Sequence, residues 1–341
     1  MNKKLLAAAV AAAVVAAPAA FADAVVYGKI HNSIDMNDSS VANSDNWTVE
    51  SRASRLGFKG SEDLGGGLKA IYQIELGVNT DGGTAQTAGG TFGTRTRNTF
   101  VGLAGGWGTL VVGRHDTPAK MAFYASGNEL IGDSAIDLNS GTIGVFNEVR
   151  ANNAIAYVSP NFSGFSFAAA VVPGEETGGG NASDGIADHI SVGLMYKGGG
   201  LKVGVGYEEL DNQAGGAAPT APNVDREMWQ AGASYTFGMF QVGAHYESTD
   251  NSGFVSGTDY TAWAITGKAK FGNSAVSLVY TDSESDPAAG ASTETDGWGL
   301  AAEHNLSKRT KVYAAYATED TETGAASSDA DTFSLGVIHD F

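Results

Sequence analysis

Apolar side chains alternate strictly with small or polar ones over stretches of roughly ten residues. Residues 201–208 read Leu-Lys-Val-Gly-Val-Gly-Tyr-Glu, and residues 240–247 read Phe-Gln-Val-Gly-Ala-His-Tyr-Glu. Helical spacing would not place these apolar residues on one side, whereas a strand does. The pattern therefore predicts β-strands with one apolar face and one face of small or polar residues.

Two kinds of connection separate the strands. Seven are short and rich in Gly or Asn, as in Gly198-Gly-Gly200, whereas others are long and acidic, as in Ser283–Thr295 and Asp320–Ala330. Seven tight turns imply 14 strands in hairpins. Val25–Asp35 before them and Asp331–Phe341 after them bring the expected number to 16.

Residues 1–22 resemble an export signal. Lys3 and Lys4 precede an apolar run, and the small residues Ala20 and Ala22 mark a cleavage site. We predict a signal peptide at 1–22 and one barrel domain at 23–341. Cleavage removes two lysines and no acid, so the formal charge falls from −18 to −20. This charge argues against nucleic acid as a partner, because phosphates would be repelled.

The composition excludes several architectures. Charged residues are only 17 % of the chain, and glycine supplies 47 of 341 residues. Past residue 22, no apolar run reaches the ~20 residues of a transmembrane helix. The absence of cysteine excludes disulfides and Cys-ligated metal sites.

A membrane-spanning barrel fits the strand pattern better than a soluble sandwich or propeller. A soluble sheet shows a polar, often charged outer face, whereas the non-apolar face here is mostly Gly, Ser, Ala and Thr. Aromatic residues near the strand ends suit a lipid interface, and a sheet in lipid must close because its edges need partners. We predict an all-β fold, a 16-stranded antiparallel transmembrane β-barrel with short periplasmic turns and long extracellular loops.

A series of short motifs resembles a known family. The series contains Tyr27-Gly-Lys-Ile30, Arg55-Leu-Gly-Phe58, Asn98-Thr-Phe-Val-Gly-Leu103, Gly108-Thr-Leu-Val-Val-Gly-Arg114 and the terminal Phe341. Together they resemble the general trimeric porins of Gram-negative bacteria. The resemblance covers the whole mature chain and is strongest over residues 25–115 and at the C-terminus.

The resemblance implies a homotrimer in the Gram-negative outer membrane, in contact with lipid and lipopolysaccharide. Each barrel would be a water-filled diffusion channel for small hydrophilic solutes and ions rather than an enzyme. The third long loop would fold into the barrel, and the strand ending in Phe341 would be recognised by the outer-membrane assembly machinery.

Strand parity offers candidates for the pore wall, because a water-filled lumen tolerates charge and a lipid face does not. Lys29 and Arg55 fall on the polar faces of their strands, and Arg97 lies on the face opposite Phe100. Parity does not decide the face of Arg114. In porins of this kind a ladder of basic side chains lines the constriction. Matching the motifs carries that role to Lys29, Arg55, Arg97, Arg114 and, more loosely, Arg150.

The third loop, about Asp116–Asn152, is the longest connection, and loops of this length are usually functional. It is predominantly acidic. An acidic loop facing a basic wall would produce a transverse field that orients dipolar solutes. We assign the acidic side of the constriction to Glu129, Asp133 and Asp137.

Two alternatives remain open at this stage. One is a channel selective for anions such as phosphate or small carboxylates, and the other is a closed barrel acting as an enzyme or adhesin. The sequence contains no Walker loop, no Gly-x-Gly-x-x-Gly, no His-Glu-x-x-His and no Gly-x-Ser-x-Gly motif. We therefore predict no catalytic residue, no cofactor and no metal site.

Overall fold

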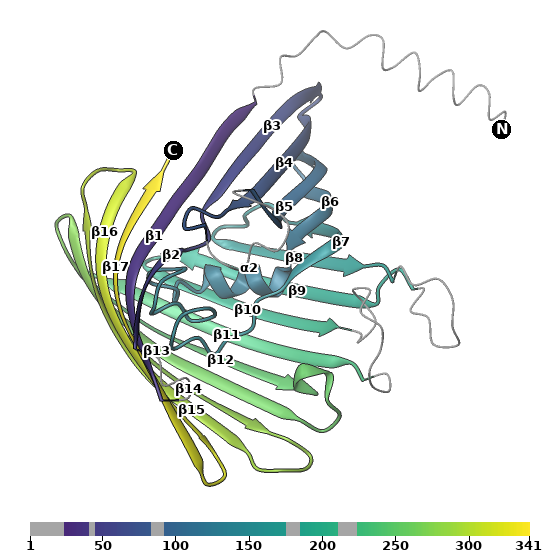
Figure 1. Cartoon of the computed structure of the whole chain (residues 1–341). Helices are drawn as coiled ribbons and strands as arrows, with labels where there is room; N and C mark the ends of the chain where they lie inside the picture. Colours follow the sequence, from purple (N-terminus) through teal and green to yellow (C-terminus); the bar gives the residue numbers. More distant parts are fainter. Residues whose placement is uncertain (1–23, 41–44, 83–91, 175–184, 211–223) are drawn as a thin grey trace.

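The computed structural model describes residues 24–40, 45–82, 92–174, 185–210 and 224–341. The predicted signal peptide at 1–22 lies outside these residues. All strands belong to one antiparallel sheet that closes on itself through pairing of β1 with β17 (Figure 1). The elements are β1 (Val25–Ser39), β2 (Asn46–Ser51), β3 (Arg55–Gly65), β4 (Leu68–Val78), β5 (Phe92–Gly105), β6 (Gly108–Asp116), α2 (Pro118–Ala125), β7 (Arg150–Val158), β8 (Phe165–Val172), β9 (His189–Gly198), β10 (Leu201–Leu210), β11 (Arg226–Phe237), β12 (Phe240–Asp250), η1 (Ser252–Phe254), β13 (Asp259–Phe271), β14 (Ser274–Asp286), β15 (Thr293–Asn305), β16 (Thr310–Thr323) and β17 (Ala326–Asp340).

The seventeen labelled strands make a 16-stranded barrel, because β2 and β3 are two halves of one barrel strand. Both halves pair with β1, and the chain bulges between them at residues 52–54. Ala53 has a φ of 43° there, and Ser54 Oγ donates to the carbonyl of His31 over 3.1 Å. The prediction of a 16-stranded antiparallel barrel is confirmed, and its second strand is interrupted.

The C-terminal residue completes the closure. The backbone N–H of Gly28 donates to the carbonyl of Phe341 over 3.1 Å, and Phe341 donates back to Gly28 over 3.0 Å. The ring of Phe341 fills the space that a side chain at residue 28 would need. Gly28, in the motif Tyr27-Gly-Lys, therefore leaves room for the ring of Phe341.

The strand faces follow the alternation read from the sequence. Val205 and Leu278 are 36 % and 55 % exposed on the outer surface, whereas their neighbours Gly206 and Ser277 are buried on the inner side. The aromatic residues near the strand ends also point outward, among them Trp229, Tyr235, Phe240, Tyr246, Trp263 and Trp298. The outer face is thus an apolar band with aromatic edges, as a lipid-facing barrel requires.

Two predicted acidic loops are mostly strand. Segment 283–295 continues β14 and β15, and segment 320–330 continues β16 and β17, leaving only two residues in the last hairpin turn. Threonine explains the difference, because it alternates with the acids and favours strands. The Thr293 and Thr295 hydroxyls hydrogen-bond across to Thr323 and Thr321 at 2.9 and 3.1 Å.

Candidate pore constriction

The third loop, residues 117–149, enters the barrel and begins with α2. The Thr117 side chain caps the helix by accepting from the backbone N–H of Lys120 over 3.3 Å, and Pro118 occupies its first turn. The helix contacts the inner wall at β9 and β10, and it lies inside the barrel in Figure 1. The expected inward fold of this loop is confirmed.

Wall glycines provide the contact surface for α2. The carbonyl oxygens of Pro118 and Ala122 occupy the positions that a Cβ at Gly193 and at Gly204 would take. A Cβ at Gly206 would stand 2.8 Å from the Cα of Ala119. The glycines on the polar side of the alternation therefore let the helix backbone lie directly against the wall.

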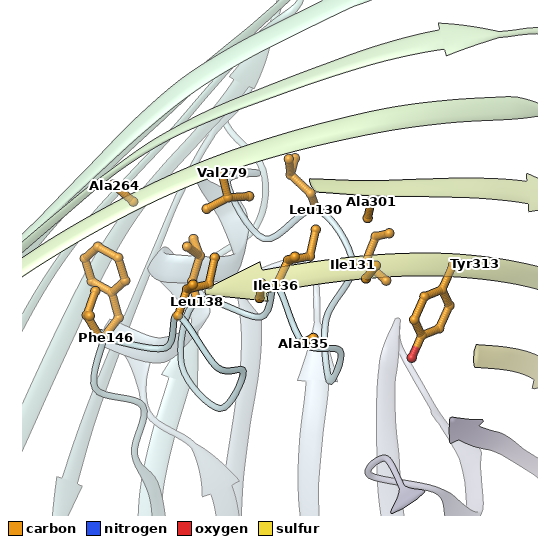
Figure 2. Close-up of a cluster of buried hydrophobic side chains, with 14 of the residues drawn as sticks. Leu130, Ile131, Ala135, Ile136, Leu138, Phe146, Ala264, Val279, Ala301 and Tyr313 are labelled. Carbon is orange, nitrogen blue, oxygen red and sulfur yellow. The ribbon is translucent and has the colours of Figure 1, made fainter. Parts of the chain in front are cut away.

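The rest of the loop packs through an apolar cluster (Figure 2). Ile136, Leu138 and Ile143 are fully buried, and they pack with small wall residues such as Ala264 and Ala301. Burying large aliphatic side chains is worth about 1.5–3 kcal/mol each. The loop is thus held as a packed layer on the far wall, opposite β2–β7.

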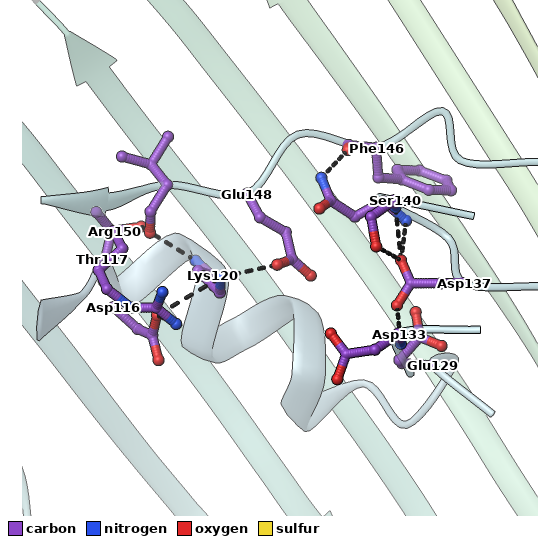
Figure 3. A network of polar contacts seen from close by, with 12 residues as sticks. Asp116, Thr117, Lys120, Glu129, Asp133, Asp137, Ser140, Phe146, Glu148 and Arg150 are labelled. Carbon is purple, nitrogen blue, oxygen red and sulfur yellow. Dashed lines mark hydrogen bonds and ion pairs between the residues drawn. The ribbon is translucent and has the colours of Figure 1, made fainter. Parts of the chain in front are cut away.

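A polar network fixes the base of the loop (Figure 3). Lys120 Nζ lies 2.8 Å from Glu148 Oε2 and 3.5 Å from Asp116 Oδ1. Arg150 Nη2 lies 2.9 Å from the same Asp116 oxygen, and its Nε donates to Asn98 Oδ1 over 2.9 Å. These pairs join the two ends of the loop to each other and to β5.

The three predicted loop acids have different surroundings. Asp137 is 2 % exposed, and its carboxylate accepts backbone N–H groups of Asp133, Asn139 and Ser140 at 2.6, 2.8 and 2.6 Å. It therefore holds the loop backbone and does not face an opening, in contrast to the sequence expectation. Buried carboxylates that accept several N–H donors serve as turn formers.

Glu129 is also turned inward within the loop. Its Oε2 accepts the backbone N–H of Leu138 over 3.1 Å, while its Oε1 is buried without a hydrogen-bond partner among the described residues. Burial, and then the charge of Asp137, raise the pKa of Glu129 well above its ordinary value. A proton on Glu129 is therefore held more tightly than on an exposed glutamate.

Asp133 is the predicted loop acid that faces the opposite wall. Burial and Asp137 raise its pKa, while the positive charges of Arg55, Lys29 and Arg97 oppose the rise. Lys29 and Arg55 stand directly opposite each other in the β1–β3 register. The structure thus brings three of the five predicted bases into electrostatic reach of one loop acid.

A cavity of about 670 Å³ lies between the loop and the wall of β2–β7. Asp133 and Ser140 of the loop contribute to its lining, together with Glu50 of β2. Its bases are the guanidinium groups of Arg52, Arg97, Arg114 and Arg150. Three predicted wall arginines therefore share one space with Asp133, joined by Arg52, which sequence reasoning missed.

Buried carboxylates orient two of these arginines. Arg97 Nε lies 2.7 Å from Glu75 Oε1, and Arg52 forms an ion pair with Asp35. The carboxylate side chains are 10 % and 1 % exposed, whereas the two arginine side chains are 23 % and 20 % exposed. The arginine is thus the more exposed member of each pair, and its positive charge faces the cavity.

Arg114 reaches the cavity through a bulge. Parity in the sequence did not decide its face, because both faces of residues 110–114 are mixed, and the β6–β7 register shifts between Gly113 and His115. Its Nε donates to the carbonyl of Thr96 over 2.8 Å, and its guanidinium also hydrogen-bonds to Asn152. No carboxylate within the described ranges forms an ion pair with Arg114.

The missed residues had only weak signals in the sequence. Arg52 lies in the bulge between β2 and β3, where strand parity breaks. Glu75 also accepts the Tyr27 hydroxyl over 2.9 Å, but nothing in its segment marks it as a partner of Arg97. The available clue was that Glu75 and Asp35 lie on the polar faces of strands next to Arg97 and Arg52.

Comparison with known proteins decides the family. A family model described as Gram-negative porin matches residues 7–324. The chain belongs to the Gram-negative porin family. It is an outer-membrane β-barrel that forms a water-filled diffusion channel for small hydrophilic solutes and ions.

Relatives and a solved structure cover almost all of this porin. It is 29 % identical to an outer membrane porin protein of Bordetella pertussis, over 92 % of this chain and 93 % of the relative. It is 30 % identical to outer membrane porin protein 32 of Delftia acidovorans, over 92 % and 88 %. The anion-selective porin from Comamonas acidovorans superposes with a TM-score of 0.72 at 23 % identity, over 94 % of this chain and 100 % of that one.

Proposed function

We propose that this porin is a general diffusion channel that favours anions, with its constriction between Asp133 of the third loop and the basic wall. The observation that carries the proposal is the cavity whose exposed charges are mainly guanidinium groups. Arg114 and Arg97 offer planar donor forks suited to carboxylates and phosphates. Lys29, Arg55, Arg97, Arg114 and Arg150 are the proposed basic wall.

The negative net charge does not oppose this proposal, because many of the acids lie outside the pore. Asp282 stands opposite Asp296, which stands opposite Asp320, along the outward faces of β14, β15 and β16. Charges on the outer rim are separated from the lumen by the wall and are screened beyond about 10 Å. The local balance at the constriction sets the preference, and a porin of similar fold is described as anion-selective.

Ion replacement in single-channel recordings tests the preference. If anions carry most of the current, replacing chloride by the slower acetate lowers conductance more than replacing potassium by the slower lithium. The double variant Arg52→Gln with Arg114→Gln should reduce this difference, and Lys308→Gln in an exposed periplasmic turn should not. A larger loss with lithium than with acetate would contradict the proposal.

The assembly of the porin is a further part of the proposal. A homotrimer in contact with lipid and lipopolysaccharide is supported by the family resemblance and by the wide apolar outer surface. Phe341, 43 % exposed at the seam between β17 and β1, is the proposed signal for the assembly machinery. A band that runs at the mass of a trimer without heating and at the mass of a monomer after heating would support the trimer. A monomer band before heating would oppose it.

A further inference from the structure

Three lysines lie on the inner wall near the short turns, two of them on the neighbouring strands β9 and β10 and one on β13. Lys197 of β9 and Lys202 of β10 stand directly opposite each other in the strand register. Lys202 also interacts electrostatically with Lys270 near the end of β13. Like charges placed opposite each other in a sheet are unfavourable, so a bound anion would relieve the repulsion within this lysine cluster.

The described part of the chain supplies no such counter-charge. Within the described ranges, no carboxylate lies at ion-pair distance from Lys197, Lys202 or Lys270. Glu303, an acid on the same inner wall, is already occupied. Its two oxygens lie 2.8 Å from Lys268 Nζ and 3.6 Å from Lys311 Nζ.

The third loop contacts the lysine cluster at Lys202. A Cβ at Gly127, just past the end of α2, would stand 2.7 Å from Lys202 Cδ and 3.0 Å from its Nζ. Gln241 Nε2 donates to the carbonyl of Gly127 over 2.7 Å, and Ser234 Oγ donates to that of Ser126. The cluster therefore lies beneath the loop, at the periplasmic exit of the constriction.

We propose that Lys197, Lys202 and Lys270 form a second anion-binding site, on the periplasmic side of the third loop, for multivalent oxyanions of the phosphate class. It lies in series with the arginine-lined cavity and rests on the proposed anion preference. Ammonium groups bind phosphate oxygens as point charges. Three of them match an anion with several charges far better than they match chloride.

Blocking of single-channel chloride current by inorganic pyrophosphate tests the site. Pyrophosphate is added to one chamber at a time, so the block is measured separately from each end of the channel. The double variant Lys197→Gln with Lys270→Gln leaves Lys202 in contact with the loop. We expect it to weaken the block from one chamber about tenfold or more, with the block from the other chamber nearly unchanged.

The control variant Lys308→Gln alters an exposed short turn between β15 and β16, and pyrophosphate should block it as it blocks the wild type. Equal pyrophosphate block of wild type and double variant from both chambers would overturn the second site, even if chloride still carries most of the current. A channel in which potassium carries most of the current would instead overturn the anion preference itself. The two failures are thus distinguishable.

Discussion

The backbone carbonyl of Ala122 in α2 occupies the space that a side chain at Gly204 of β10 would need. The distance between the third loop and the wall is therefore set by the missing side chain of a glycine. Because the loop also faces the opposite wall, this contact fixes how far it projects into the lumen.

Gly204→Ala should push α2 away from the wall and narrow the channel. Overpacking of this kind costs about 1–3 kcal/mol, so thermal stability should fall and single-channel conductance should decrease. Gly267→Ala is the matched control, because no atom of the described segments lies within 4 Å of where its Cβ would stand. A Gly204→Ala channel with wild-type conductance would show that this contact does not set the opening.

Lys120→Met should loosen the base of the third loop. Its ammonium group neutralises Glu148, whose side chain is 6 % exposed, and removing one partner of a buried pair costs about 3–5 kcal/mol. We expect increased current noise and faster proteolysis within residues 117–149. Lys311→Met, which removes a longer contact of 3.6 Å, should leave the loop protected. Equal protection in both variants would argue against the network as the anchor.

Glu129 gives the loop a defined pH dependence. Burial raises its pKa well above the ordinary glutamate value, so the folded state binds its proton more tightly than the unfolded state does. Its contribution to stability is full below the unfolded pKa and is lost as pH rises through the folded pKa. Stability should therefore increase as the pH falls from alkaline values towards the ordinary glutamate pKa of about 4.3. Melting curves at an alkaline and a mildly acidic pH should show a smaller change for Glu129→Gln, and an unchanged difference would refute this role.

Asp133 and Asp137 should respond differently to the same substitution. Asp133→Asn removes a charge that faces Arg55 and Arg97, so the reversal potential should shift towards anions with little loss of stability. Asp137→Asn replaces one of the two carboxylate oxygens that accept three backbone N–H groups by an amide donor, and it should destabilise the loop by about 1–3 kcal/mol. Identical effects of the two variants on selectivity and melting would contradict the separation of their roles.

The alternation and the turn residues predicted most of the barrel, because both are local properties of the chain. Strand parity gives no clear face where the pairing shifts register, as opposite Gly113 and His115, where β7 carries the extra residue, and around Ala53. These bulges redirect Arg114 and bring Arg52 into the cavity. Composition alone did not separate Asp133, which faces the wall, from Asp137, which holds the loop. That difference depends on the folded path of the loop.

The reversal potential of the wild-type channel in a potassium chloride gradient tests the central claim most directly. With the arginine-lined cavity as the narrowest charged region, we expect the zero-current potential to have the sign of chloride permeation. We also expect it to move towards zero in the double variant Arg52→Gln with Arg114→Gln. A potential with the sign of potassium permeation, unchanged in that variant, would contradict the claim that the basic wall controls the pore.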